Sequence, residues 1–119
     1  MAQHNTIGKL GEELARKYLE SKGYGILEQN YKTRRGEIDL IAKHKNELII
    51  IEVRTKHHEQ FGTPEETIDY KKRLRLLRNA NAYIAKIKHT GLCRIDAVCV
   101  VIDENKGLRR ITHYENICG

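Results

Sequence analysis

Two acidic residues, Asp39 and Glu52, have a spacing that could hold a metal ion. Each lies in an apolar segment, 37–43 and 48–55 respectively, and a short polar connection separates the two segments. Carboxylate oxygens are the ligands that Mg²⁺ takes in proteins, and like charges that face each other on neighbouring strands destabilise a sheet. A divalent cation, Mg²⁺ or Mn²⁺, is therefore one interpretation of the pair. The alternative is a structural ion-pair network with nearby arginines, namely Arg34, Arg35 and Arg54.

The pairing of the two apolar segments decides whether these carboxylates meet. Both segments are apolar at most positions, as in strands that are buried on both faces. With the turn centred on Lys45 and Asn46, Asp39 lies directly opposite Glu52 across a hairpin. A slip of one residue would move the apolar side chains to the wrong face, so the pattern specifies the register. The apolar pairs in this register are Ala42 with Ile49, Leu40 with Ile51 and Ile38 with Val53, and Glu37 falls opposite Arg54.

The remaining segments predict an α/β fold, a mixed sheet flanked by helices in the order α-β-β-β-α-β-β. Apolar residues at three- and four-residue spacing predict a first helix over 6–22. A second helix ends near residue 88, and it begins either at the capping box of residues 63–66 or at the rival cap Asp69. The predicted strands are 25–32, 37–43, 48–55, 94–102 and 108–114, and residues 1–119 are expected to form one domain.

The second helix carries a block of positive charge. Its predicted core-facing residues are Leu74, Leu77, Ala80, Ile84 and Ile87. The other face is basic, and the whole chain has a net charge of +6. Such a surface is typical of proteins with a polyanionic partner, and a solvated helix face is the plainer interpretation. The candidate nucleic-acid-binding residues are Lys32, Arg34, Arg35, Lys71, Lys72, Arg75 and Arg78.

Composition and cysteine usage predict a cytoplasmic protein. The apolar stretches are far shorter than the ~20 residues that a membrane-spanning helix needs, so no membrane partner is expected. The first residues lack the apolar core of a secretion signal. The cysteines Cys93, Cys99 and Cys118 form no CxxC pair, which indicates free thiols in a reducing compartment.

The chain resembles nucleases of the restriction-endonuclease-like fold, which include Holliday-junction resolvases. Asp39, a gap of twelve residues and then Glu52-Val53-Arg54 are similar to the Asp…Glu-x-Lys signature of that group. Glu12, four residues after Gly8, matches the spacing of a further glutamate on their first helix. The closer resemblance is to the YraN-like bacterial family, regarded as endonucleases. It rests on short blocks in the family's order, above all GEIDLIA at 36–42, IEVR at 51–54 and RIDAV at 94–98.

The resemblance implies a restriction-endonuclease-like fold and Mg²⁺-dependent hydrolysis of phosphodiester bonds. It implies that Glu12, Asp39 and Glu52 hold the metal, that Asp39, Glu52 and Arg54 are catalytic, and that the backbone carbonyl of Val53 adds a ligand. Arg54 stands where the wider group has lysine. An arginine stays charged and cannot act as a base, but it can hold the phosphate. Related nucleases often pair, so a homodimer is a further expectation.

Three functions are compatible with the sequence. The first is an endonuclease that acts on nucleic acid of irregular structure, with DNA favoured over RNA as the substrate. The second is a nucleic-acid-binding protein that has the same fold and no catalysis, which the arginine at position 54 favours. The third is a protein-interaction module whose acidic cluster is only structural.

Several polar residues also have plainer structural interpretations. Glu12 has Arg16 as a possible surface partner four residues later. Asp96 interrupts a buried strand and is interpreted as a structural carboxylate that needs a partner. Cys99 is interpreted as a small core residue. His57 and His58 are expected in a solvated loop over residues 55–62.

Overall fold

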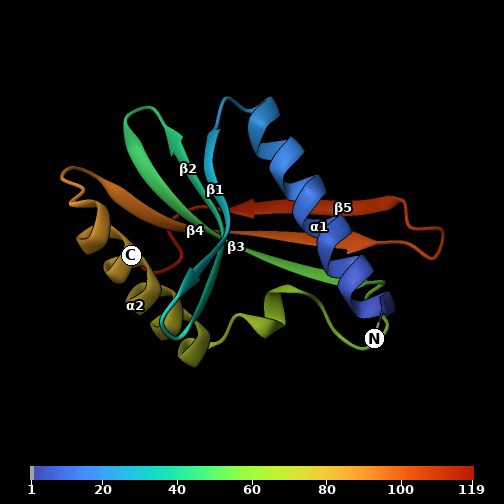
Figure 1. Ribbon diagram of the computed structural model, residues 1–119. Helices are drawn as coiled ribbons and strands as arrows, with labels where there is room; N and C mark the ends of the chain where they lie inside the picture. The colour runs from blue at the N-terminus through green and yellow to red at the C-terminus, as the bar shows by residue number, and fades with distance from the viewer. Residues whose placement is uncertain (1) are drawn as a thin grey trace.

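Two helices pack on opposite faces of a five-stranded sheet in the computed structural model, which describes the backbone of residues 2–119 and the side chains of residues 6–119 (Figure 1). The helices are α1 (Ala2–Ser21) and α2 (Tyr70–Ile87), with a 3-10 helix, η1 (Glu65–Thr67), before α2. The strands are β1 (Gly25–Thr33), β2 (Gly36–His44), β3 (Glu47–His57), β4 (Cys93–Ile102) and β5 (Leu108–Tyr114). The predicted α/β class and the order α-β-β-β-α-β-β are confirmed.

The sheet has the order β1-β2-β3-β4-β5, so each strand lies beside its neighbours in sequence. All neighbouring pairs are antiparallel except β3 and β4, which are parallel. Parallel strands need a long crossover connection, and α2 lies in the connection between β3 and β4. The predicted register of the central hairpin is confirmed from His44↔Glu47 to Leu40↔Ile51.

The sheet separates two apolar cores. The core under α1 contains Leu40, Ala42, Ile49, Ile51 and Val53 from β2 and β3, together with alternate residues of β4. The core under α2 contains Ile41, Leu48 and Ile50, with Leu76, Ala80 and Tyr83 from the helix. Because β2 and β3 contribute to both cores, their paired central residues, 40–42 and 48–51, are all apolar.

α1 packs closely against β3 at one glycine. A Cβ atom at Gly11 would overlap the side chain of Thr55, whereas a Cβ atom at Gly8, one turn earlier, would meet no atom within 4 Å. The absence of a side chain at Gly11 therefore lets α1 approach β3, and this approach sets the position of Glu12.

The two glycines of α1 give a matched test of this packing. We expect Gly11→Ala to destabilise the protein by about 1–3 kcal/mol, because overlap with Thr55 forces a shift in a packed core. Gly8→Ala has space for the methyl group and is expected to stabilise the fold by roughly 0.5–1 kcal/mol through helix propensity. Urea unfolding of both variants measures the difference, and equal effects of the two substitutions would contradict the close approach at Gly11.

The two rival caps of the second helix are both used. Thr63 and Glu66 form a reciprocal capping box, in which each side chain accepts a hydrogen bond from the backbone N–H of the other residue. This box precedes η1, and Asp69 caps α2 by accepting from the N–H of Lys72 at 2.8 Å. The second helix therefore begins at Tyr70, and the capping box marks the short helix before it.

The predicted core face of α2 is wrong in part. Ala80 is buried and Ile84 packs on the core as expected, but Leu77 and Ile87 are 40% and 44% exposed. The buried positions are instead Leu76, Ala80 and Tyr83. The run of leucines at 74, 76 and 77 fits two helical phases, and α2, which begins at Tyr70 after its cap Asp69, packs in the phase that buries Leu76.

One predicted pair of the central hairpin is also wrong. Ile38 belongs to the core under α2, whereas Val53 belongs to the core under α1. The pairing of β2 with β3 ends at Leu40↔Ile51, so no ladder holds Ile38 opposite Val53.

The structure bears on the predictions made for the cysteines and for membrane-spanning helices. Cys93, Cys99 and Cys118 are free thiols, and Cys99 is fully buried, as expected of a small core residue. In the part of the chain that the structure describes, neither helix has the length and apolar character needed to cross a membrane.

Candidate active site

The candidate site lies where β2 and β3 stop pairing with each other. Beyond Leu40↔Ile51, β2 remains paired with β1 and β3 remains paired with β4, so the sheet forks. At this fork the backbone N–H of Val53 donates a hydrogen bond of 2.8 Å to Oδ2 of Asp39. Asp39 and Glu52 lie next to each other at the fork, close enough for their carboxyl groups to share a hydrogen bond.

Asp39 lies in surroundings that disfavour its charged form. Burial, followed by the neighbouring charge of Glu52, raises its pKa from 3.8 to about 8. The negative charge of Glu12 on α1 acts in the same direction, and the hydrogen bond from Val53 opposes the shift without cancelling it. Asp39 therefore needs either a proton or an added positive charge.

Glu52, by contrast, has two cationic side chains beside it. Its side chain is buried, and its Oε2 lies 3.0 Å from Nη1 of Arg54 and 3.1 Å from Nζ of Lys72. Nε of Arg54 also donates a hydrogen bond of 2.7 Å to Oγ1 of Thr67, which fixes the guanidinium group from a second side. Of the arginines considered as structural partners, Arg54 contacts the acidic pair, and Arg34 and Arg35 are exposed in the β1–β2 turn.

Glu12 approaches the site from α1 without joining the acidic pair. Its Oε1 accepts a hydrogen bond of 2.9 Å from the side chain of Asn30 on β1. Arg16, the surface partner considered for Glu12, pairs with Glu20 at 3.3 Å instead. Among the described residues, no three His, Cys, Asp or Glu side chains are arranged as a ready-made metal site.

The donors at the fork nevertheless fit a divalent cation. Asp39 and Glu52 offer hard oxygen atoms, and the raised pKa of Asp39 reflects excess negative charge that a cation would offset. Glu12 is near enough for its charge to act on Asp39, so it could contribute a third carboxylate after leaving Asn30.

The contacts that Lys72 and Thr67 make at the site are not predicted from the sequence. The prediction that Lys72 lies on the solvent-exposed face of the helix is wrong, because its side chain is only 23% exposed and contacts Glu52. The spacing of four residues puts Lys72 on the same face of α2 as the buried residues Leu76 and Ala80. This spacing is the sequence signal that could have placed Lys72 at the site. Thr67 lies in η1, where no pattern indicates a contact with a strand.

The predicted partner of Arg54 across the hairpin is wrong. Glu37 pairs with Lys32 of β1 at 3.0 Å, because β2 pairs with β1 rather than β3 at this point. His57 was expected in a loop but ends β3, where it is half-buried.

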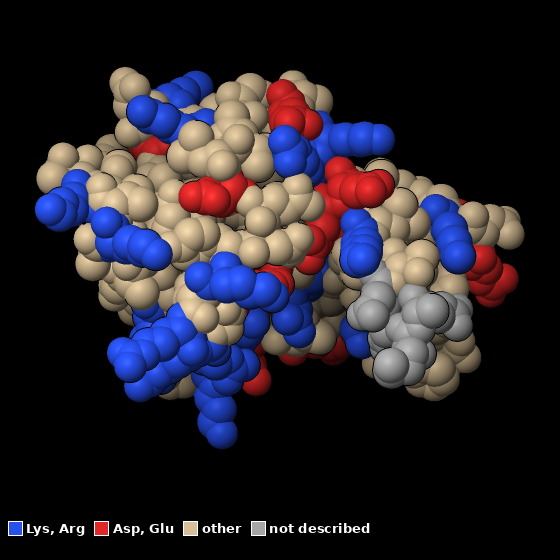
Figure 2. Space-filling view, viewed as in Figure 1, with Lys and Arg blue, Asp and Glu red and all other residues tan. Residues whose placement is uncertain are grey.

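A basic surface lies beside the site. Figure 2 shows Lys and Arg side chains gathered at the lower left, over α2 and the β1–β2 turn of Figure 1. The turn and the helix are joined by a 2.9 Å hydrogen bond from Thr33 to Asn79. Except for the half-buried Lys72, the candidate nucleic-acid-binding residues are exposed: Lys32, Arg34, Arg35, Lys71, Arg75 and Arg78.

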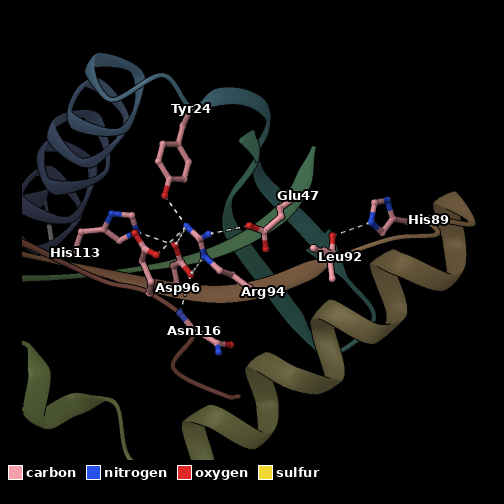
Figure 3. A network of polar contacts seen from close by, with 9 residues as sticks. Tyr24, Glu47, His89, Leu92, Arg94, Asp96, His113 and Asn116 are labelled. Atoms are coloured by element: carbon pink, nitrogen blue, oxygen red, sulfur yellow. Dashed lines mark hydrogen bonds and ion pairs between the residues drawn. The ribbon is translucent and has the colours of Figure 1, made fainter. Parts of the chain in front are cut away.

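A second buried carboxylate, Asp96 on β4, is fully paired (Figure 3). Nε and Nη2 of Arg94 lie 2.9 and 3.0 Å from its two oxygens, and Nε2 of His113 lies 2.8 Å from Oδ2. The backbone N–H of Asn116 donates a further hydrogen bond of 3.0 Å. Arg94 in turn donates to the hydroxyl of Tyr24 at 2.6 Å. The interpretation of Asp96 as a structural carboxylate with partners is confirmed.

Comparison with known proteins places the chain in a family. Residues 11–100 match Uncharacterised protein family UPF0102. A UPF0102 protein of Caldanaerobacter subterraneus subsp. tengcongensis is 39% identical over 113 residues, which cover 93% of each chain. A UPF0102 protein of Bacteroides thetaiotaomicron is 42% identical over 113 residues, which cover 95% of this chain and 92% of the relative. The chain therefore belongs to family UPF0102, the YraN-like family whose sequence blocks it carries.

Proposed function

We propose that this protein is an endonuclease that depends on Mg²⁺ or Mn²⁺ and hydrolyses phosphodiester bonds in DNA. The observation that carries the proposal is the position of Asp39, which is half-buried beside Glu52, accepts a hydrogen bond from Val53 and has a raised pKa. Among the described residues, Arg54 and Lys72 pair with Glu52, and no Lys or Arg forms an ion pair with Asp39. A divalent cation at this fork would bind both carboxylates and offset the charge that Asp39 carries.

Each residue at the fork has a role in such a reaction. A bound metal ion activates water at neutral pH and stabilises charge on the phosphate. Asp39 and Glu52, with Glu12 as a third carboxylate, hold the metal. Arg54 and Lys72 lie beside the carboxylates and would hold the oxygens of the scissile phosphate, where their positive charge stabilises the transition state. Arg54 stays protonated, so it acts through its charge and its hydrogen bonds.

The basic surface supports nucleic acid as the substrate. Cations on α2 and on the β1–β2 turn are exposed beside the fork, where they can contact successive phosphates. Such contacts position a nucleic acid and carry no sequence information. The proposal therefore includes recognition by DNA structure rather than by sequence. One site cuts one strand, so cleavage of a duplex would use a homodimer, and the free thiols agree with a cytoplasmic enzyme.

A second candidate function is nucleic-acid binding without catalysis. Arg54 replaces the lysine of the wider nuclease group, and Glu52 is already neutralised by two cations. A binding protein of this kind would show a steep fall in affinity with salt and no cleavage with any metal.

A cleavage screen separates the two functions. Single-stranded, duplex, flap and four-way-junction DNA, with matched RNA strands, are incubated with the protein in Mg²⁺, in Mn²⁺ and in EDTA. We expect metal-dependent cleavage of at least one irregular DNA substrate, and no cleavage by Asp39→Asn, which controls for a contaminating nuclease. Binding of these substrates without cleavage by the wild-type protein would support the second function.

Lys72 and Lys71 give a matched pair for the phosphate-binding role. Lys72 contacts Glu52, whereas its neighbour Lys71 is exposed on α2. We expect Lys72→Met to slow cleavage at saturating substrate by roughly 100-fold. Lys71→Met is expected to weaken DNA binding modestly and to reduce the slope of log affinity against log salt concentration by about one, the value for one phosphate contact. The cleavage rate at saturating substrate should stay unchanged. Single-turnover kinetics measure both, and equal rates for the two variants would contradict a role for Lys72 at the phosphate.

A further inference from the structure

A groove of about 630 Å³ adjoins the candidate active site. It is lined by Gly8 and Glu12 of α1, by the end of β3, and by Phe61 and Thr67 in the segment that follows β3. In Figure 1 the first half of α1 and this segment lie together at the end of the molecule marked N. Glu12 belongs to both the groove and the surroundings of Asp39, so the groove is continuous with the fork.

Phe61 presents a bare aromatic ring at the groove. It is 86% exposed, the highest value among the large apolar side chains that the structure describes, and the ring of His58 lies 6.5 Å away at an angle of 63°. An aromatic face of this kind, next to positive charge, is a platform on which a nucleobase can stack.

His57 contributes a polar atom that lacks a partner. Its Nε2 is shielded from solvent and forms no hydrogen bond among the described residues, although His57 lines the groove. Shielded polar atoms are normally paired, so an unpaired one calls for an explanation. A bound group that offers a donor or an acceptor would pair with this atom if the ring of His57 turned towards the groove.

The backbone of α1 leaves room for such a group. Gly8 lines the groove, and a Cβ atom there would meet no atom within 4 Å. A glycine inside a helix lowers its stability relative to alanine, and close packing does not explain Gly8 as it explains Gly11.

Two cationic side chains at the groove could hold a phosphate there. Arg54 and Lys56 both line it, and Arg54 is also the guanidinium that contacts Glu52 at the fork. A base stacked on Phe61 would therefore have its backbone beside Arg54. In a duplex the bases are stacked on each other, and they reach a protein pocket only when they are single-stranded or turned out of the helix.

We infer that this groove binds one unpaired nucleobase, stacked on Phe61, next to the phosphodiester bond that is cut. The substrate class is DNA with a single-stranded or unstacked nucleotide at the cleavage point. The inference rests on the proposed nuclease function and deepens it, since it assigns the preference for irregular DNA to a groove.

The test measures binding in EDTA, so its result does not depend on cleavage. Fluorescence anisotropy gives the affinity of the wild-type protein and its variants for a single-stranded oligonucleotide and for a duplex of equal length. Phe61→Ala removes the platform, Phe61→Trp keeps an aromatic ring, and Gly8→Met fills the groove. Leu92→Ala is the matched control, because Leu92 is 69% exposed but lies beside Leu48 near the beginning of β3.

We expect Phe61→Ala and Gly8→Met to weaken single-strand binding by about 10-fold or more while changing duplex binding little. Phe61→Trp and Leu92→Ala are expected to bind as the wild type does. Unchanged single-strand affinity in folded Phe61→Ala and Gly8→Met, or a wild-type protein that binds no single strand, overturns the inference. Metal-dependent cleavage with unchanged Phe61→Ala binding would refute only the groove, whereas groove-dependent binding without cleavage would refute only the nuclease.

Discussion

Asp39→Asn is expected to abolish metal-dependent cleavage and, in metal-free buffer, to raise the melting temperature of the protein. The amide oxygen can still accept the hydrogen bond from Val53, and the amide N–H can donate to Glu52. The substitution thus removes a half-buried carboxyl group whose charged form has no Lys or Arg partner among the described residues, and it keeps the hydrogen bonds. A residue that lowers stability while serving activity is typical of a functional site.

The stability effect of Asp39→Asn has a definite dependence on pH. The pKa of Asp39 is raised in the folded protein, so its contribution is most favourable below about pH 4 and is lost as the pH rises through about 8. The gain in melting temperature of Asp39→Asn over the wild type is therefore expected to grow between these two values and then to level off. Thermal unfolding in EDTA across this range measures it.

Glu13→Gln is the control for this pH series, because Glu13 is exposed on α1. It is expected to show no growing difference from the wild type. Addition of Mg²⁺ is expected to stabilise the wild type and Glu13→Gln, but not Asp39→Asn, since a ligand that binds the folded state raises its stability. If Asp39→Asn melted below the wild type at high pH in EDTA, the charge of Asp39 would already be compensated in the metal-free protein.

Asp96→Ala is expected to cost about 3–5 kcal/mol of stability, the largest loss of any single substitution considered for this chain. Asp96 is fully buried, and its removal leaves Arg94 and His113 without their shared acceptor in the interior. Glu115→Ala is the matched control. Glu115 contacts the same arginine at 3.7 Å but is 58% exposed, so its loss is expected to cost under about 1 kcal/mol.

Urea unfolding of Asp96→Ala and Glu115→Ala compares the two losses of stability directly. The fall in stability of the wild type at acid pH gives a second check. Burial alone would raise the pKa of Asp96, but hydrogen bonds from His113, Arg94 and Asn116 hold it below its ordinary value. The stabilisation from Asp96 is therefore present above about pH 4 and is lost as the pH falls further. Asp96→Ala should not show this loss of stability at acid pH. Equal losses from both substitutions would mean that the buried contacts of Asp96 contribute no more to stability than the exposed contact of Glu115 with Arg94.

Much of the fold could be predicted because local pattern and tertiary packing agree. The segments that became β2 and β3 are apolar on both faces, and their match fixed the register from His44↔Glu47 to Leu40↔Ile51. The predicted direct pairing of Asp39 with Glu52 lies beyond the last pair of this ladder, but the two side chains are still neighbours, so the sequence indicated the acidic pair. The extent of one domain over residues 1–119, the metal and the nucleic-acid partner stay predictions.

The rest of the site depends on features that a linear pattern does not carry. Lys72 reaches Glu52 from the buried side of α2, and an apolar pattern with leucines at 74, 76 and 77 does not choose between two helical phases. Thr67 contacts Arg54 from a short 3-10 helix that has no periodic signal. The fork itself follows from where the ladder between β2 and β3 ends, which only the packed sheet determines.

Titration calorimetry with Mg²⁺ and Mn²⁺ tests the central claim most directly, because it asks whether the paired carboxylates at the fork bind a cation before any substrate is added. For the wild-type protein we expect saturable binding that tightens as the pH rises towards 8 and releases protons, since Asp39 must lose its proton to bind. Asp39→Asn is expected to lose this binding while remaining folded. Equal metal affinity in the wild type and in Asp39→Asn, or no binding by either, would contradict the account.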